Sequence, residues 1–374
     1  MIFSKQSTRN FLKRLPKITY VFLGLALFSQ IILISASLSP TFALYFDNYV
    51  SRGVRAGLAF ISSPFPFSIA ELLIILSPIF VTLLIIYALK RHSSSVGSIL
   101  SFFITLASCA TLVFTLFVFS FGVGYHTPSL YQRLEISNNG TTASELKEAA
   151  SMLVAEINNR APYLEFTEGG ASKMPCSTAT MNDLLSASLK SINKNHGFVQ
   201  GFKSRIKPVL LSAPMSRTHT TGVYSFFTGE VNLNMAFPDY TLPYTAAHEL
   251  AHQHGIARED EANFAAFLIC AQTTDTYIEY CAYLNLFEYV AAALYTESPE
   301  AYKEIYNELS PSVKKELAVY SDFYGKYQDS KAGKIGSALN NAYLTANGSE
   351  DGAKSYDLVV DLAVAYLLGN FDDK

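Results

Sequence analysis

The stretch "YTAAHELAHQHGIAREDEANFAAFLIC", from Tyr244 to Cys270, places three histidines and four carboxylates in a largely apolar sequence. Burying that many ionisable groups is costly unless they are paired or coordinated. Within the stretch, His248, Glu249 and His252 spell HExxH. Residues i and i+4 of a helix share one face, with Cβ atoms ~6 Å apart, so both imidazoles can bind one metal ion. The stretch therefore predicts a buried helix that holds a metal.

The glutamate of the motif indicates which chemistry the metal would serve. Glu249 lies one step round the helix from His248, so its carboxylate leans toward a metal-bound water instead of the metal. Zinc lowers the pKa of its water, and a carboxylate can take the proton. The other positions of this helix are small or apolar, namely Ala246, Ala247, Leu250 and Ala251. The pattern predicts a Zn²⁺ cofactor and hydrolysis, with Glu249 as general base.

An HExxH match needs a third ligand and a helix end. Gly255 lies three residues beyond His252, where a glycine can adopt the left-handed conformation that ends a helix. A second helix from about Ala257 carries Glu259 and Glu261. We expect Glu259 to be the third ligand. Glu261 in that role, and a site that uses neither, remain alternatives.

HExxH followed by E-x-x-A-N on the next helix resembles the gluzincin pattern, seen in HtpX-like membrane proteases and in the ImmA/IrrE peptidase group. The resemblance implies that Glu259 is a zinc ligand and that Asn263 supports the site. The gap after His252 is short for a gluzincin, so the turn at Gly255 must be tight. The opening HExxHxxG is also similar to metzincins. Arg258 stands where their third histidine would be, however, and arginine stays protonated.

More closely, "PYTAAHELAHQHGIAREDEANFAAFLIC", together with the upstream "GVYSFFTGEVNLN" and three apolar runs, resembles an uncharacterised bacterial family. That family consists of membrane-anchored HExxH proteins known as a domain of unknown function. The resemblance covers nearly the whole chain. It implies the architecture and the candidate ligands, and it implies no substrate.

Three apolar runs are long enough to cross a hydrocarbon core of ~30 Å, which takes about 20 helical residues. They extend from Ile18 to Leu38, from Phe67 to Leu89 and from Val96 to Tyr125. Hydrophobic residues make up 50% of the chain and charged residues only 16%, which is too apolar for an average soluble protein. We expect a membrane anchor over residues 1–125, in contact with the lipid bilayer, and a water-soluble domain over residues 126–374.

Basic residues beside the spans predict the orientation, because Lys and Arg resist translocation. Five of them precede the first span, and Lys90 and Arg91 separate the second from the third. Both segments should be cytoplasmic, so the loop 39–66 and the chain after Tyr125 should lie outside. The segment "SSPFPFS", residues 62–68, lies where this loop meets the second span, and it predicts an interfacial turn. We expect a multi-pass protein of the cytoplasmic membrane with an extracytoplasmic C-terminal domain.

The external domain should combine helices with a small sheet. The segment "TASELKEAASMLVAEINNRA" has apolar residues at a helical period. Two segments just before the motif, "RIKPVLLSAP" and "GVYSFFTGEVNLNMAF", look like strands, because the second is rich in β-branched and aromatic residues with turn signals. After Cys270 the chain is again mostly helical. The predicted fold class is α+β, with three N-terminal transmembrane helices followed by a mostly helical zincin-like domain with a small β-sheet.

The net charge bears on nucleic-acid binding, and the cysteine pattern bears on metal sites and disulfides. A formal net charge of -3 gives no basic field, so no nucleic-acid partner is expected. The four cysteines include no CxxC pair, and Cys109 falls in an apolar run. Cys176 could be a structural thiol, form a disulfide with Cys270 or Cys281, or act as an inhibitory thiolate on the zinc. The sequence leaves that pairing open.

Several neighbouring residues have a structural and a functional interpretation. His254 should be a partly exposed residue at the helix end, since it points away from the face of the two ligand histidines. Tyr277, Tyr280 and Tyr283 should be packing residues, although a tyrosine can donate to an oxyanion. The segment "GVYSFFTGEVNLN" is equally compatible with plain core sheet and with an edge strand that binds extended substrate.

The sequence thus predicts a peptidase whose substrate is a peptide or protein outside the membrane. Zinc would be held by His248, His252 and Glu259, with Glu249 as general base and Asn263 as outer support. The alternative is a non-catalytic envelope sensor or scaffold with structural zinc. A structural site uses four protein ligands, whereas this motif offers three and leaves a position for water. That difference favours the enzyme.

Overall fold

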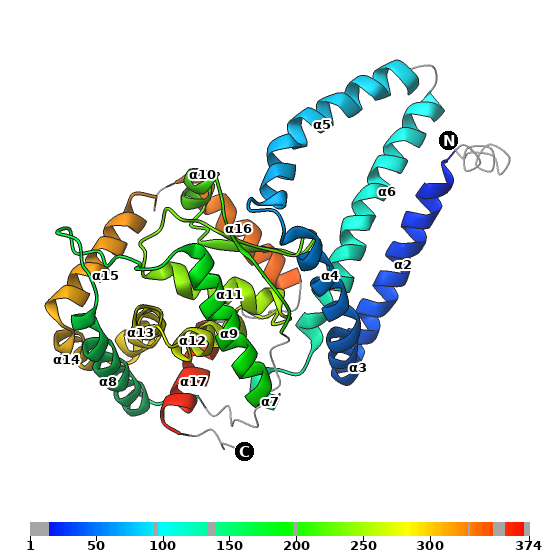
Figure 1. Ribbon diagram of the computed structural model, residues 1–374. Coiled ribbons are helices and arrows are strands. Elements are labelled where there is room, and N and C mark those ends of the chain that lie inside the picture. The colour runs from blue at the N-terminus through cyan, green and yellow to red at the C-terminus, as the bar shows by residue number, and fades with distance from the viewer. Residues whose placement is uncertain are drawn as a thin grey trace. The chain divides into compact units, whose positions relative to one another are not determined.

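A computed structural model of the chain is mostly helical, with one small sheet (Figure 1). It describes residues 15–92, 96–133, 140–196, 201–327, 330–346 and 356–369. The chain divides into two compact units. The first comprises Met1–Val54 and Ile69–Thr127, and the second comprises Arg55–Ser68 and Pro128–Lys374.

The first unit contains the three helices that the sequence predicts to be long and apolar enough to cross a membrane. They are α2 (Lys17–Leu38), α5 (Ile69–His92) and α6 (Val96–Ser120). α2 packs along α6, and Ser29 Oγ donates to Thr115 Oγ1 over 3.2 Å between them. Such a bond satisfies polar groups where water is absent. Short segments complete the unit: α3 (Pro40–Phe46), the π-helical η1 (Asp47–Ser51) and the 3₁₀-helical η2 (Gly122–His126).

The second unit consists of helices around a three-stranded sheet. Its helical elements are α4 (Arg52–Ser62), α7 (Leu130–Arg133), α8 (Ala143–Arg160), η3 (Ala161–Tyr163), α9 (Thr178–His196), α10 (Ser212–Arg217), α11 (Thr241–Gln253), α12 (Glu259–Ala271), α13 (Thr276–Glu297), α14 (Pro299–Glu308), α15 (Pro311–Gly325), α16 (Lys331–Ala346) and α17 (Tyr356–Leu367). Most of α4 and the turn after it pack with this unit. The sequence analysis placed that segment, as a loop between spans, in the membrane anchor.

The sheet lies just before the HExxH helix in sequence, as predicted. Its strands are β1 (Ile206–Pro208), β2 (Gly222–Ser225) and β3 (Glu230–Leu233), in the order β1-β3-β2. β1 runs parallel to β3, and β2 runs antiparallel to it. The turn between β2 and β3 is closed by a hydrogen bond of 2.7 Å from Gly229 N–H to the Ser225 carbonyl. Because β3 is the central strand, β2 forms one edge of the described sheet.

The HExxH helix α11 and its successor α12 lie in the core of the second unit. α11 packs against β2, β3 and α12, and α12 packs against α13 (Figure 1). α8 covers α13, and its apolar face, which includes Leu146 and Leu153, is buried. A capping box between Thr142 and Glu145 begins α8. This arrangement confirms the predicted helix there.

The cysteines are free thiols throughout the described ranges. Cys270 and Cys281 are buried in the core, and Cys270 Sγ lies 3.4 Å from the Pro243 carbonyl oxygen. Burial raises the pKa of both thiols, so they behave as inert packing groups. Cys176 is half-buried and forms none of the disulfides that the sequence left open.

Candidate metal centre

α11 presents His248 and His252 on one face, one turn apart. The helix ends where the sequence predicts. Gly255 has a φ of +109°, and its N–H donates to the His252 carbonyl over 3.1 Å. A glycine in this conformation reverses the chain without a steric penalty. α12 then starts at Glu259, so the tight turn brings that carboxylate back over α11.

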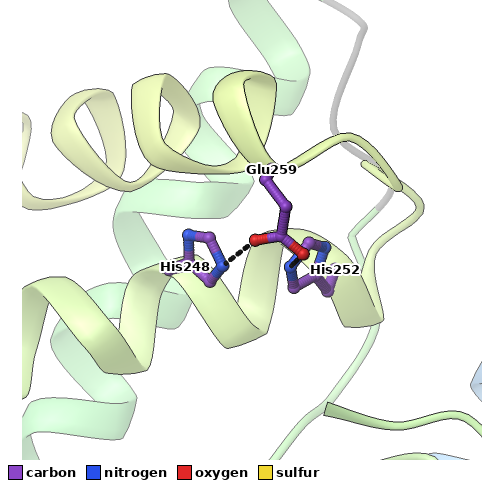
Figure 2. Close-up of side chains that lie close together, drawn as sticks. All are labelled: His248, His252 and Glu259. Carbon is purple, nitrogen blue, oxygen red and sulfur yellow. Dashed lines mark ion pairs between the residues drawn. The ribbon is translucent and has the colours of Figure 1, made fainter. Parts of the chain in front are cut away.

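Three side chains converge at this point (Figure 2). His248 Nε2 lies 3.1 Å from Glu259 Oε2, and His252 Nε2 lies 3.5 Å from Glu259 Oε1. One potential ligand atom from each residue falls within 4.8 Å of the others. Two ligands of a tetrahedral zinc ion, with bonds of ~2.0–2.1 Å, lie roughly 3.4 Å apart. The separations and the donor set therefore fit zinc.

The tautomer of His252 is set by its outer hydrogen bond. Its Nδ1 lies 2.7 Å from the Ile256 carbonyl oxygen, which can only accept. Nδ1 must carry the proton, which leaves the Nε2 lone pair for a metal. The Nδ1 of His248 is buried with no hydrogen-bond partner among the described residues. The two histidines thus differ in how firmly their rings are oriented.

The charges of the three residues are strongly coupled. Burial lowers the pKa of His252, but the carboxylate of Glu259 outweighs burial and raises this pKa to about 9. Burial raises the pKa of Glu259, but His252 and His248 lower it well below its usual range. The metal-free site therefore holds an ionised carboxylate beside a protonated imidazole. A divalent cation would take the place of that proton.

Zinc affinity should depend on pH for this reason. Below about pH 9 the metal must displace a proton from His252. We expect the apparent affinity to rise about tenfold per unit between roughly pH 7 and 9, since one proton is released. Competition with a chromophoric chelator at several pH values measures this slope. An affinity that stays constant over the range would contradict the coupling between His252 and Glu259.

Glu249 is buried beside the cluster and is held by β2. A Cβ on Gly222 would come within 2.8 Å of Glu249 Cγ and 2.9 Å of its Oε1, so a larger residue here would push this side chain aside. The backbone N–H of Tyr224 donates to the same carboxylate. Burial raises the pKa of Glu249, and the two histidines oppose that effect. A carboxylate with a raised pKa is a stronger proton acceptor once it is ionised.

The structure separates the two candidates for the third ligand. Glu259 faces both histidines, whereas Glu261 Oε1 accepts from Leu130 N–H at 2.8 Å and from Arg258 Nη1 at 2.9 Å. Glu261 thus has two donors of its own. Asn263 is buried on α12, and its carbonyl oxygen accepts from Tyr244 Oη over 2.7 Å. That bond ties α11 to α12, while support by the Asn263 side chain stays a prediction.

His254 departs from the sequence-based expectation. It was predicted to be partly exposed, but it is only 2% exposed, and its ring lies 4.2 Å from that of Phe202, centroid to centroid. The segment before β1 covers this end of α11, which the local sequence does not indicate. Among the described residues, His254 is not part of the group formed by the three candidate ligands.

The tyrosines after α12 are packing residues. Tyr277 Oη lies 3.1 Å from Ser172 Oγ, and Tyr280 Oη donates to Glu316. Tyr283 packs against the core as well. With those hydroxyls committed to core partners, Tyr277 and Tyr280 are poor candidates for an oxyanion donor.

Sequence reasoning missed two residues that position the general-base candidate. Gly222 and Tyr224 belong to the segment "GVYSFFTGEVNLN", whose pattern predicts a strand but not a contact with Glu249. Their contacts with Glu249 join β2 to α11 across the fold. A glycine at the start of a strand next to a motif helix was the one local signal available.

The chain thus combines two features. Three of its helices are long and apolar enough to span a membrane, and its mostly helical second unit brings two histidines and a glutamate together. The chain belongs to the family described as "Protein of unknown function (DUF3810)", whose model matches residues 46–364. The predicted resemblance to a domain of unknown function is confirmed. Comparison with curated proteins and with solved structures found no match.

Proposed function

We propose that the protein is a membrane-anchored zinc metallopeptidase that hydrolyses peptide bonds outside the cytoplasmic membrane. The observation that carries this proposal is the convergence of His248, His252 and Glu259 on one point, with Glu249 beside them. Three protein ligands leave a position for water, as in catalytic zinc sites. The proposal includes a zincin-like fold for the second unit. The sheet packed on the HExxH helix supports that assignment.

In the proposed reaction, Glu249, Glu259 and His252 each have a different role. Bound zinc would supply an acidified water and positive charge near a developing oxyanion. Glu249, held by Gly222 and Tyr224, accepts the proton of the attacking water at its carboxylate and delivers it to the leaving amine. Glu259 would hold the ion as the third ligand and offset part of its charge. The Nδ1 bond of His252 to Ile256 keeps its imidazole oriented.

The proposed substrate is a peptide or an extended segment of a protein. β2 is an edge strand in the described sheet and lies directly against the α11 face that carries Glu249. Edge strands bind extended peptides by adding them to the sheet. We therefore assign the approach of substrate to this edge.

The proposed orientation places the second unit outside the cytoplasm. The basic residues before α2 and between α5 and α6 would stay inside. A periplasm-active reporter fused after Lys374 should therefore be active, and a reporter that needs the cytoplasm should be silent. The opposite pair of results would reverse the orientation and place the hydrolysis inside the cell.

Metal removal tests the proposed activity. Full-length protein in detergent, treated with a chelator, should lose cleavage of an unstructured peptide library, and zinc should restore it. Zinc at about 100 times its Kd should also add about 2.7 kcal/mol of stability, because it binds the folded chain. Cleavage that persists in metal-free protein would rule out a zinc peptidase.

The rival is a non-catalytic zinc-binding sensor or scaffold of the envelope. It shares the ligands His248, His252 and Glu259 but has no use for a general base. Burial of Glu249 against Gly222, beside the ligands, favours the enzyme, because a buried carboxylate without a task is a cost to stability.

A further inference from the structure

The segment from α4 to the start of α5 has two contrasting faces. In α4, Arg55, Ala59 and Ser62 are buried, whereas Phe60 is 79% exposed and Ile61 is 65% exposed. Exposed apolar side chains of this size, next to one another, are unusual on a water-facing helix. This helix therefore has a buried face toward its own unit and an apolar face that the described chain leaves uncovered.

Two more aromatic residues follow in the turn after α4. Phe65 and Phe67 are both partly exposed, and their ring centroids lie 5.7 Å apart. Phe65 N–H donates to the Ser62 carbonyl over 3.1 Å, which keeps the turn against the end of the helix. We call the four exposed side chains Phe60, Ile61, Phe65 and Phe67 the α4 patch.

The α4 patch is firmly attached to the sheet of the second unit. Lys207 Nζ, paired with the buried Glu230, donates to the Ser62 carbonyl over 2.8 Å. Arg205 Nη1 donates to the carbonyls of Ser63 and Pro64 at 3.0 and 3.3 Å. The patch is therefore a rigid part of the second unit and not a loose linker.

We infer that the α4 patch rests in the lipid–water interface and fastens the second unit to the bilayer surface. Phe67 precedes the first residue of α5, Ile69, by two positions, so at full extension the chain places it within ~7 Å of the span. Because the chain joins the α4 patch to this span through so few residues, the patch stays near the depth at which the span leaves the membrane. Amphipathic elements in this position bury their apolar side ~5–10 Å deep.

Cationic side chains at the rim agree with a lipid partner. Lys203 and Arg205 are exposed, and Arg205 contacts the turn that carries Phe65. Exposed cationic side chains beside apolar ones are typical of surfaces that meet phosphate headgroups.

The α4 patch also connects to the candidate metal centre. The backbone of Gly229 lies against α4, where a Cβ would come within 2.6 Å of Leu58 Cβ and 2.8 Å of Ala59 N. The Gly229 carbonyl accepts from Gln253 Nε2 over 2.7 Å, and Gln253 follows His252 on α11. Gly229 therefore contacts both α4, which carries the α4 patch, and α11, which carries the two histidines. The inference stands whether or not that centre is catalytic.

Tryptophan fluorescence can test this inference directly, because the chain contains no tryptophan. Phe60→Trp and Phe65→Trp each introduce a single tryptophan, which can be excited apart from the tyrosines, at an exposed site where the fold tolerates the change. Tyr163→Trp is the matched control, since Tyr163 is 82% exposed on η3 of the same unit. Each full-length variant is reconstituted into phosphatidylcholine vesicles whose acyl chains carry bromine near the headgroup end, and circular dichroism verifies folding.

We expect brominated lipid to quench the two α4-patch variants, Phe60→Trp and Phe65→Trp, at least about twofold, because their indoles would lie ~5–10 Å deep. The same lipid should quench the Tyr163→Trp control little, and aqueous iodide should quench that control most. Equal quenching of all three variants by iodide would overturn the inference and leave the patch in water. Protection of both α4-patch variants from both quenchers would also overturn it, since a second copy or another protein would then cover the patch.

Discussion

Replacing Glu249 by glutamine should reduce peptide hydrolysis by roughly 10²–10⁴-fold while zinc content stays unchanged. The amide has the same size and hydrogen-bonding reach as the carboxylate, so contacts with Gly222 and with the Tyr224 N–H can be kept in part. It cannot accept the proton of an attacking water. The rate should fall in kcat, measured with a fluorogenic peptide against matched zinc occupancy.

The matched control for this change is Glu288→Gln. Glu288 is a half-buried glutamate of the same unit whose carboxylate accepts from Tyr240 Oη at 3.3 Å, away from the candidate ligands. Its amide should leave hydrolysis within a small factor of the natural chain. Full activity of the Glu249 variant, or full rescue of a deletion phenotype by it, would favour the sensor or scaffold.

Much of the site could be predicted because its determinants are local. The i, i+4 spacing of His248 and His252 fixes one helix face, and Gly255 marks the end of that helix. The distance along the chain from Gly255 then limits which carboxylate can return to the histidines, and Glu259 is the one that does. The three apolar spans are equally local, because length and composition define them.

The features that were missed depend on neighbours far apart in sequence. Nothing local indicates that Gly222 touches Glu249, that Phe202 covers His254, or that most of α4 packs with the second unit. The buried pair of Lys207 and Glu230 is similarly invisible, since each residue alone is typical of a solvent-exposed strand. Such contacts arise from tertiary packing, which period and propensity do not encode.

Replacing His252 by alanine should leave the protein without zinc as purified. We expect zinc affinity to fall by at least about 100-fold, because even loss of an outer hydrogen bond to a ligand costs 10- to 100-fold. The change also removes one of the two imidazoles beside the half-buried Glu259 carboxylate, so the metal-free variant should melt at a lower temperature. Metal content measured by mass spectrometry and thermal unfolding report the two effects.

His254→Ala is the control for that experiment. It removes an equally buried imidazole from the end of the same helix without touching the three candidate ligands. Its zinc content should match that of the natural chain, even if its packing against Phe202 is weakened. A second variant, Glu259→Gln, keeps the size of the third ligand and should lower zinc affinity and hydrolysis together. Normal zinc content in the His252 variant would remove this histidine from the ligand set.

The most direct test of the metal centre is X-ray absorption at the zinc edge on the full-length protein. We expect about one zinc ion per chain with nitrogen and oxygen neighbours at ~2.0–2.1 Å, and scattering from two imidazole rings. His252→Ala, loaded with excess zinc, should lose the scattering of one ring. A spectrum with sulfur neighbours at ~2.3 Å, or one that is unchanged in the variant, would contradict a centre formed by His248, His252 and Glu259.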